Sequence, residues 1–133
     1  MVFVTPALQV LGRALDAAAL RQRTIAQNIA NVNTPGFKRY YVTFEDELRR
    51  ALRGGDGLPL YRTHPRHLPQ GALYLEPRVH QERTTSMRED GNNVDVDREM
   101  VELVMNTLNY NLLVQQLNGR LGMLRYVINE GRR

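Results

Sequence analysis

Two histidines, His64 and His67, stand three residues apart, a spacing at which two imidazoles can share a metal ion. They flank a proline in His64-Pro65-Arg66-His67, so they do not share a helix face, and no Asp, Glu or Cys stands beside them to complete a zinc site. We therefore expect a loop held by a histidine hydrogen bond. A hydrolase that uses this pair has no support beyond their proximity.

The segment Asp90–Asp97 is the second candidate for a cation site. An EF-hand loop needs oxygen ligands at its first, third and fifth positions and glycine at its sixth. Here the fifth position is Val94 and the glycine, Gly91, is second. We expect a turn with Gly91 at positive φ, followed by an extended approach to a helix. With no Gly-rich phosphate loop, no nucleophile elbow and no cysteine, the sequence indicates no enzyme, no metal and no cofactor.

The formal net charge is +4, which raises the possibility of a basic helical protein that binds nucleic acid. The arginines are scattered along the chain, however, and no aromatic residues alternate with them. A solvated basic surface is the simpler interpretation, and we expect neither a nucleic acid nor a small-molecule substrate as partner.

The sequence predicts a long N-terminal helix over 6–32, since Pro6 suits a first helical position and only Gly12 interrupts the helix formers. Apolar residues there recur at alternating steps of three and four, a coiled-coil pattern. The members proposed as a packing seam are Leu8, Leu11, Leu15, Ile25 and Ile29. The helix should end at a turn of Asn33, Thr34, Pro35, Gly36 and Phe37, in which proline then glycine fit a type II turn.

A second helix is predicted over 97–130, with Asp97 as its cap and Gly131 after its end. Its contribution to the same seam consists of Leu117, Leu121, Leu124 and Ile128. A second stripe on another face of its first half needs a separate partner. The candidates for contacts between molecules are Val101, Met105, Leu108, Tyr110, Leu112, Asn28, Asn31, Asn106 and Asn109. The asparagines are included because buried amides can fix the register of paired helices.

The middle segment, 38–96, is rich in proline and glycine. A short amphipathic helix is predicted from Thr43, with Thr43 as its cap, and short extended pieces at 72–80 and 92–96. The predicted fold is mainly α, with an antiparallel coiled-coil-like pair of terminal helices and a turn-rich middle that contains a short helix and a small β element. The segments 1–37, 38–96 and 97–133 then form one domain.

The helix lengths favour an assembling subunit. At 1.5 Å per residue the two helices measure roughly 40 and 50 Å. A globule of this chain length is about 35 Å across. The second stripe therefore needs another molecule, although a self-contained helical hairpin remains the alternative. We expect Leu121→Asp to abolish assembly without affecting expression.

Three segments resemble a known family. The segment Ala26–Lys38 resembles the signature shared by flagellar rod and hook proteins. The segment Asp90–Met100, followed by Asn106, Tyr110-Asn111 and Gln115, resembles the FlgB type of proximal rod protein, as does Thr63–Leu68. The FlgC type is similar at the first motif and less so at the second.

This resemblance implies a subunit of the flagellar basal-body rod in the periplasm, one that polymerises through its terminal helices into a hollow tube. The implied partners are other copies of the chain, other rod proteins, a FliE-type adaptor, the membrane ring and the type III export gate. It also implies export by the flagellar type III apparatus. The N-terminus has no basic region before an apolar core, so we expect no cleaved signal peptide.

Overall fold

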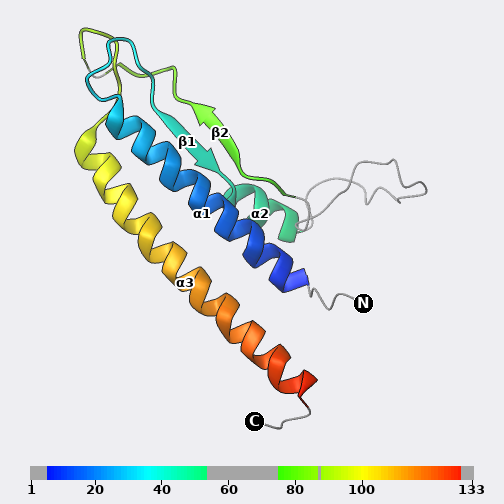
Figure 1. Ribbon diagram of the computed structural model, residues 1–133. Helices are drawn as coiled ribbons and strands as arrows, with labels where there is room; N and C mark the ends of the chain where they lie inside the picture. Colours follow the sequence, from blue (N-terminus) through cyan, green and yellow to red (C-terminus); the bar gives the residue numbers. More distant parts are fainter. Residues whose placement is uncertain (1–5, 54–74, 87, 130–133) are drawn as a thin grey trace.

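The computed structural model describes residues 6–53, 75–86 and 88–129 of the 133-residue chain. Its two long helices are α1 (Pro6–Ala30) and α3 (Val96–Ile128), which lie side by side in Figure 1. They run antiparallel, because Asn28 near the end of α1 contacts Glu99 near the start of α3. The predicted mainly α fold with paired terminal helices is confirmed.

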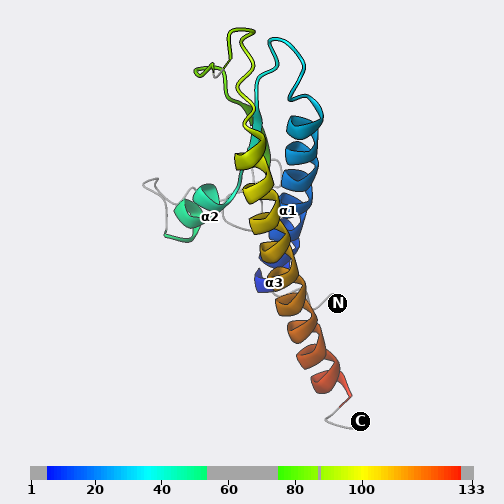
Figure 2. The same ribbon diagram turned by 90° about the vertical axis from the view of Figure 1, so that its left-hand side faces the viewer.

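The two helices differ in length, with 25 residues in α1 and 33 in α3. Figures 1 and 2 both show the last turns of α3 extending past the start of α1. Leu8, near the start of α1, lines a groove with Leu124 and Val127, so α1 reaches one side of this end of α3. Among the described residues, no helix combines the length and apolar character needed to cross a membrane.

The end of α1 and the cap of α3 each differ from the prediction by two residues. Helix α1 ends at Ala30, not Val32, because the Asn92 side chain binds the carbonyl groups of Asn31 and Val32. Helix α3 is capped by Asp95, whose carboxylate accepts hydrogen bonds from the backbone N–H of Asp97 and Arg98. Asp97 is therefore not the cap, since it already lies inside the first turn.

A two-stranded antiparallel sheet forms the middle, from β1 (Tyr40–Thr43) and β2 (Arg78–Gln81). Tyr40 is paired with Gln81 and Thr43 with Arg78. In Figure 1 the order across the molecule is α3, α1, β1, β2. The predicted extended piece over 72–80 is confirmed at 78–80, which lies in β2, whereas 75–77 is not strand and 72–74 falls outside the described residues.

Two details of the middle segment were predicted wrongly. Segment 92–96 forms no strand, because Asn92 folds back and its Oδ1 accepts the backbone N–H of Val94. The short helix α2 (Glu45–Leu52) begins after Phe44, which gives no side-chain cap. Thr43 is instead the last residue of β1, and its hydroxyl bonds the His80 ring.

The turn after α1 has the predicted geometry. The Phe37 backbone N–H donates to the Thr34 carbonyl at 3.2 Å, and Gly36 between them has φ of 71°. Gly91 also has the predicted positive φ, 81°. Both glycines occupy the left-handed region, where a side chain is disfavoured.

Gly36→Val should lower the free energy of unfolding by about 1–2 kcal/mol, the cost of holding a β-carbon in the left-handed region. A β-carbon at Gly36 would meet nothing within 4 Å, so the cost is backbone strain alone. Urea denaturation followed by circular dichroism measures it. The matched control is Gly12→Ala inside α1, also in open space, which should raise stability by about 0.5–1 kcal/mol. Equal stability of Gly36→Val and the unchanged chain would contradict the turn geometry.

Few apolar residues are fully buried in the described part of the chain, namely Ala17, Ala18, Ile25, Val42, Phe44 and Val94. Helix α3 contributes none of them, since its only fully buried residues are Glu99 and Asn106. The fully buried core thus lies on α1 and around the sheet, whereas α3 packs on α1 through half-buried apolar residues such as Leu103, Leu113 and Leu117, and through polar contacts. Much of the apolar surface of α3 is left uncovered.

Candidate functional site: a polar junction and an exposed helix face

Arg39, just before β1, joins the sheet to α3 through ion pairs. Its Nε donates to Glu99 Oε1, and its Nη2 donates to Glu102 Oε2 at 2.6 Å. Its Nη1 lies 3.4 Å from Glu82 Oε2, next to β2. The side chains of Arg39 and Glu99 are 5% and 0% exposed, so this pair is shielded from water and from screening by salt.

Burial alone would lower the pKa of the Arg39 guanidinium, but the hydrogen bond and charge of Glu99, together with Glu102 and Glu82, raise that pKa overall. Because the pKa is higher in the folded chain, the charged form stabilises the fold throughout the pH range below the ordinary arginine value. This contribution is lost only as pH rises through the raised pKa. Arg39 therefore remains a cation at every physiological pH.

Asn28 connects α1 to β1 and to α3, and it is 0% exposed. Its Nδ2 donates to the Tyr40 carbonyl at 2.7 Å and to Glu99 Oε2 at 3.0 Å, while its Oδ1 accepts the Tyr40 N–H at 2.9 Å. One amide thus serves the backbone of β1 and a carboxylate of α3. Leaving such groups unpaired in a buried place would cost free energy, so Asn28 fixes where α1, β1 and α3 meet.

Two further asparagines, Asn92 and Asn93, hold the loops together where α1 ends and α3 begins. Asn92 Nδ2 lies 2.9–3.1 Å from the carbonyl oxygens of Asn31, Val32 and Thr34, which follow the end of α1. Asn93 Oδ1 accepts the Arg39 N–H at 2.6 Å, and its Nδ2 donates to the Glu82 carbonyl at 2.9 Å. We call the set of Asn28, Arg39, Asn92, Asn93 and Glu99 the polar junction.

Asn106 forms a second polar contact, halfway along the helix pair. Its Nδ2 donates to the Ala18 carbonyl and to Gln22 Oε1, both at 2.9 Å. Its Oδ1 is buried without a partner among the described residues. An unpaired buried oxygen costs stability, whereas a mismatched register would leave both amide groups unpaired. Asn106 therefore favours one register of α1 on α3.

The residues of the predicted seam have different degrees of burial. Ile25 is fully buried. Those of intermediate exposure are Leu8, Leu11, Leu15, Ile29, Leu117 and Leu124. Leu121 and Ile128 are exposed, 39% and 69% respectively, in the part of α3 near and beyond the start of α1.

The amides proposed for contacts between molecules need a correction. Asn28 and Asn106 are buried inside the subunit and hydrogen-bonded there, so they are not free to meet a neighbour. Asn31 donates to the Gln27 carbonyl of its own helix and is partly buried. Asn109 is exposed, and Tyr110 keeps 43% of its surface.

The apolar stripe on the first half of α3 is exposed. We call this surface the outer face, and it consists of Met100, Val101, Val104, Met105, Leu108 and Leu112. Leu108 is two residues from Asn106, about 200° around the helix, so it points away from α1. Each residue of the outer face is between 48% and 60% exposed. From Leu103 to Gly119 the helix carries no formal charge at all.

Sequence reasoning missed the ion pairs of Arg39. Glu99 could have been found, because it lies four residues before the half-buried Leu103 and therefore on the same face of α3. No local signal marks Arg39 among the many other arginines.

The described residues hold no group of three or more His, Cys, Asp or Glu side chains that could bind a metal ion. His64 and His67 lie outside the described residues. His80 stacks on Tyr41 with ring centroids 5.6 Å apart, and it bonds Thr43 across the sheet. In the acidic segment, Asp90 and Asp95 accept hydrogen bonds from nearby backbone N–H groups. The Asp90 carboxylate thus stabilises the turn at Gly91, and the Asp95 carboxylate caps α3.

The fold and the site define an elongated helical structural subunit, with a polar junction that fixes its two helices and an apolar face left open. Residues 8–38 match the family model described as flagella basal body rod protein. Over 125 residues the chain is 35% identical to the flagellar basal body rod protein FlgB of Bacillus subtilis (strain 168), covering 94% of this chain and 95% of that protein.

FlgB of Escherichia coli (strain K12) is 34% identical over 130 residues, with 94% of each chain covered. FlgB of Borrelia hermsii is 43% identical over 106 residues, covering 75% of this chain and 78% of that protein. The chain belongs to the FlgB group of flagellar basal body rod proteins. It is thus a structural subunit of the rod and not an enzyme.

Proposed function

We propose that the chain polymerises through its terminal helices into the hollow proximal rod, which joins the membrane ring and export gate to the distal rod. The observation that carries this proposal is the outer face. A chain with a fixed helix pair leaves six large apolar side chains about half exposed along one side of α3. A surface of this kind on a soluble chain is typical of a contact with another protein.

The polar junction supports the same proposal from inside the subunit. A subunit that adds to a regular tube must present its faces at a constant angle. Asn28, Arg39 and Glu99 hold α1, β1 and α3 together at one end, and Asn106 holds α1 to α3 halfway along. In this proposal 1–37, 38–96 and 97–133 act as one axial domain.

Membership of this family supports a proposal for the partners and for the route to the rod. We propose contacts with other copies, other rod proteins, a FliE-type adaptor, the membrane ring and the type III export gate. We also propose a periplasmic location, reached by type III export without a cleaved signal peptide. In the assembled rod, the predicted seam joins the helix pair, and Val101, Met105, Leu108, Tyr110, Leu112 and Asn109 meet neighbours.

The test is complementation of cells whose own copy of the gene has been deleted. The unchanged chain should restore swimming and be recovered in isolated basal bodies. Leu121→Asp, in the seam, should be expressed but absent from basal bodies. The matched control is Asn118→Asp, which adds the same charge at an exposed amide one turn earlier. Normal swimming of Leu121→Asp would refute the seam, whereas absence of the unchanged chain from basal bodies would refute the function.

A further inference from the structure

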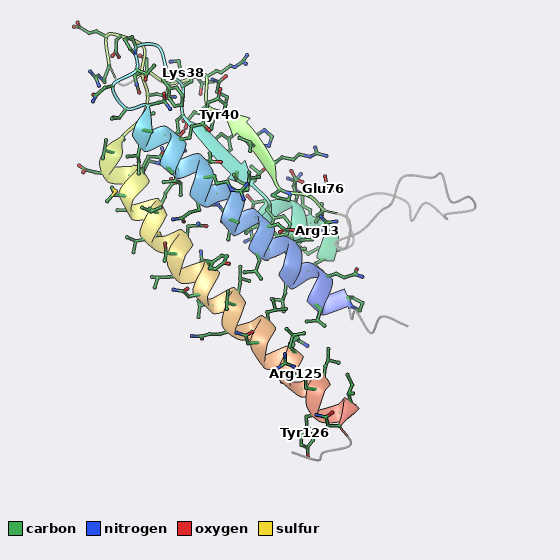
Figure 3. The ribbon with its side chains drawn as sticks, in the orientation of Figure 1. Arg13, Lys38, Tyr40, Glu76, Arg125 and Tyr126 are labelled. Atoms are coloured by element: carbon green, nitrogen blue, oxygen red, sulfur yellow. The ribbon has the colours of Figure 1, made fainter. Side chains whose placement is uncertain are left out.

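The outer face of α3 contains two methionines, and a third methionine lies further along the same helix. These residues, Met100, Met105 and Met123, are 48%, 60% and 68% exposed. Methionine is among the residue types most often found fully buried, so this exposure is unusual. In Figure 3 many side chains of α3 project away from α1 into open space. The methionines are therefore accessible to small solutes in the isolated subunit.

Met105 lies in the middle of the outer face. Val101 is four residues before it and Leu108 three residues after it, so the three side chains are neighbours on one side of the helix. Met100 stands in the same relation to Val104. The residues that form the polar junction and the predicted seam include no methionine. A chemical change at Met100 or Met105 therefore alters the outer face and leaves the contacts that fix the fold unchanged.

We propose that Met100 and Met105 are sites of oxidation by hydrogen peroxide, and that sulfoxide at these positions is compatible with folding of the subunit but not with its entry into the rod. This inference rests on the proposed function, because it requires the outer face to be covered in the rod. Since the chain has no cysteine, methionine is its only sulfur-containing residue.

The reaction is an oxygen transfer from peroxide to the thioether. The sulfur attacks one peroxide oxygen, so that an S–O bond forms and the O–O bond breaks. The proton on the transferred oxygen passes to the released hydroxide, which leaves as water. The sulfur loses two electrons and the peroxide gains them. The product is methionine sulfoxide, a polar side chain in place of an apolar one.

The effect of the sulfoxide depends on whether the outer face is covered. In the isolated subunit the side chain of Met105 is more than half exposed, so the new oxygen is hydrated and the fold loses nothing. In the rod the same oxygen would be buried beside Val101 and Leu108, which offer no hydrogen-bond donor. A buried acceptor without a partner costs free energy, so the oxidised subunit should be excluded.

Peroxide treatment of two samples tests whether these methionines are oxidised before assembly and shielded after it. The purified subunit and isolated basal bodies receive the same peroxide concentration, and mass spectrometry of peptides follows sulfoxide at Met100 and Met105. In the purified subunit both should be oxidised at close to the rate of free methionine. In basal bodies the rate at Met105 should be several-fold lower. Equal rates at Met105 in the two samples would overturn the proposal.

Glutamine substitution tests whether polarity at these positions blocks assembly. Met100→Gln combined with Met105→Gln should keep the urea midpoint of the unchanged chain, because both side chains are exposed. In cells that lack their own copy, this double variant should be missing from basal bodies and should not restore swimming. The matched control combines Met100→Leu with Met105→Leu, which keeps apolar side chains of similar volume, and should swim normally.

The outcomes separate this inference from the rod function. Normal swimming of the double glutamine variant would overturn the inference, and so would a large fall in its urea midpoint, while the unchanged chain would still be found in basal bodies. If the unchanged chain never enters basal bodies, the rod function fails and the inference fails with it.

Discussion

Arg39→Met should lower the free energy of unfolding by about 3–5 kcal/mol, the typical cost of removing one partner of a buried ion pair. The substitution keeps much of the side-chain volume but removes the charge. Glu99 would then be a carboxylate at 0% exposure with Asn28 Nδ2 as its remaining side-chain donor. Glu102 and Glu82 would lose the same cation. Urea denaturation at neutral pH, followed by circular dichroism, measures the loss.

Two variants give this measurement its controls. Glu45→Ala removes the exposed partner of Arg21, a pair at 2.6 Å in which Glu45 is 58% exposed, and should cost less than about 1 kcal/mol. The double variant Arg39→Met with Glu99→Gln should be more stable than Arg39→Met alone, because the amide does not leave a charge without a partner. A loss below about 1 kcal/mol for Arg39→Met would show that the junction is not what holds α3 in place.

Leu108→Asp should abolish swimming while leaving the subunit as stable as before. Leu108 is 60% exposed, so the charge stays hydrated in the isolated subunit and should change its stability by less than about 0.5 kcal/mol. Once a neighbour covers the outer face, the same carboxylate would be buried without a partner, at a cost of several kcal/mol per contact. Swimming assays and recovery in basal bodies measure the effect on assembly.

Gln9→Glu is the matched control for this variant. It adds the same charge at an exposed amide of α1 that is not among the proposed contacts. Swimming should be close to that of the unchanged chain. If Leu108→Asp cells swim normally, the outer face is not buried in the rod, and the observation that supports polymerisation loses its basis.

Features that depend on short stretches of sequence were predicted well. The two long helices follow from apolar residues repeating every three or four positions. The turn at Pro35-Gly36 and the positive φ of Gly91 follow from what proline and glycine allow in the backbone. The exposed stripe on α3 was also predicted, because it lies opposite the seam, and no other long helix among the described residues covers it.

The sequence alone could not determine the contacts between residues that are far apart along the chain. Asn28 meets Glu99 across 71 positions, and Arg39 meets the same carboxylate across 60. Nothing local marks these side chains, since arginine, glutamate and asparagine are ordinarily solvated surface residues. Likewise β1 exists because β2 pairs with it and Asn28 binds its backbone. Local periodicity therefore determined the helices. Only the tertiary structure decided how they are joined, because the partner of a buried polar group depends on which residues the fold brings within hydrogen-bond distance.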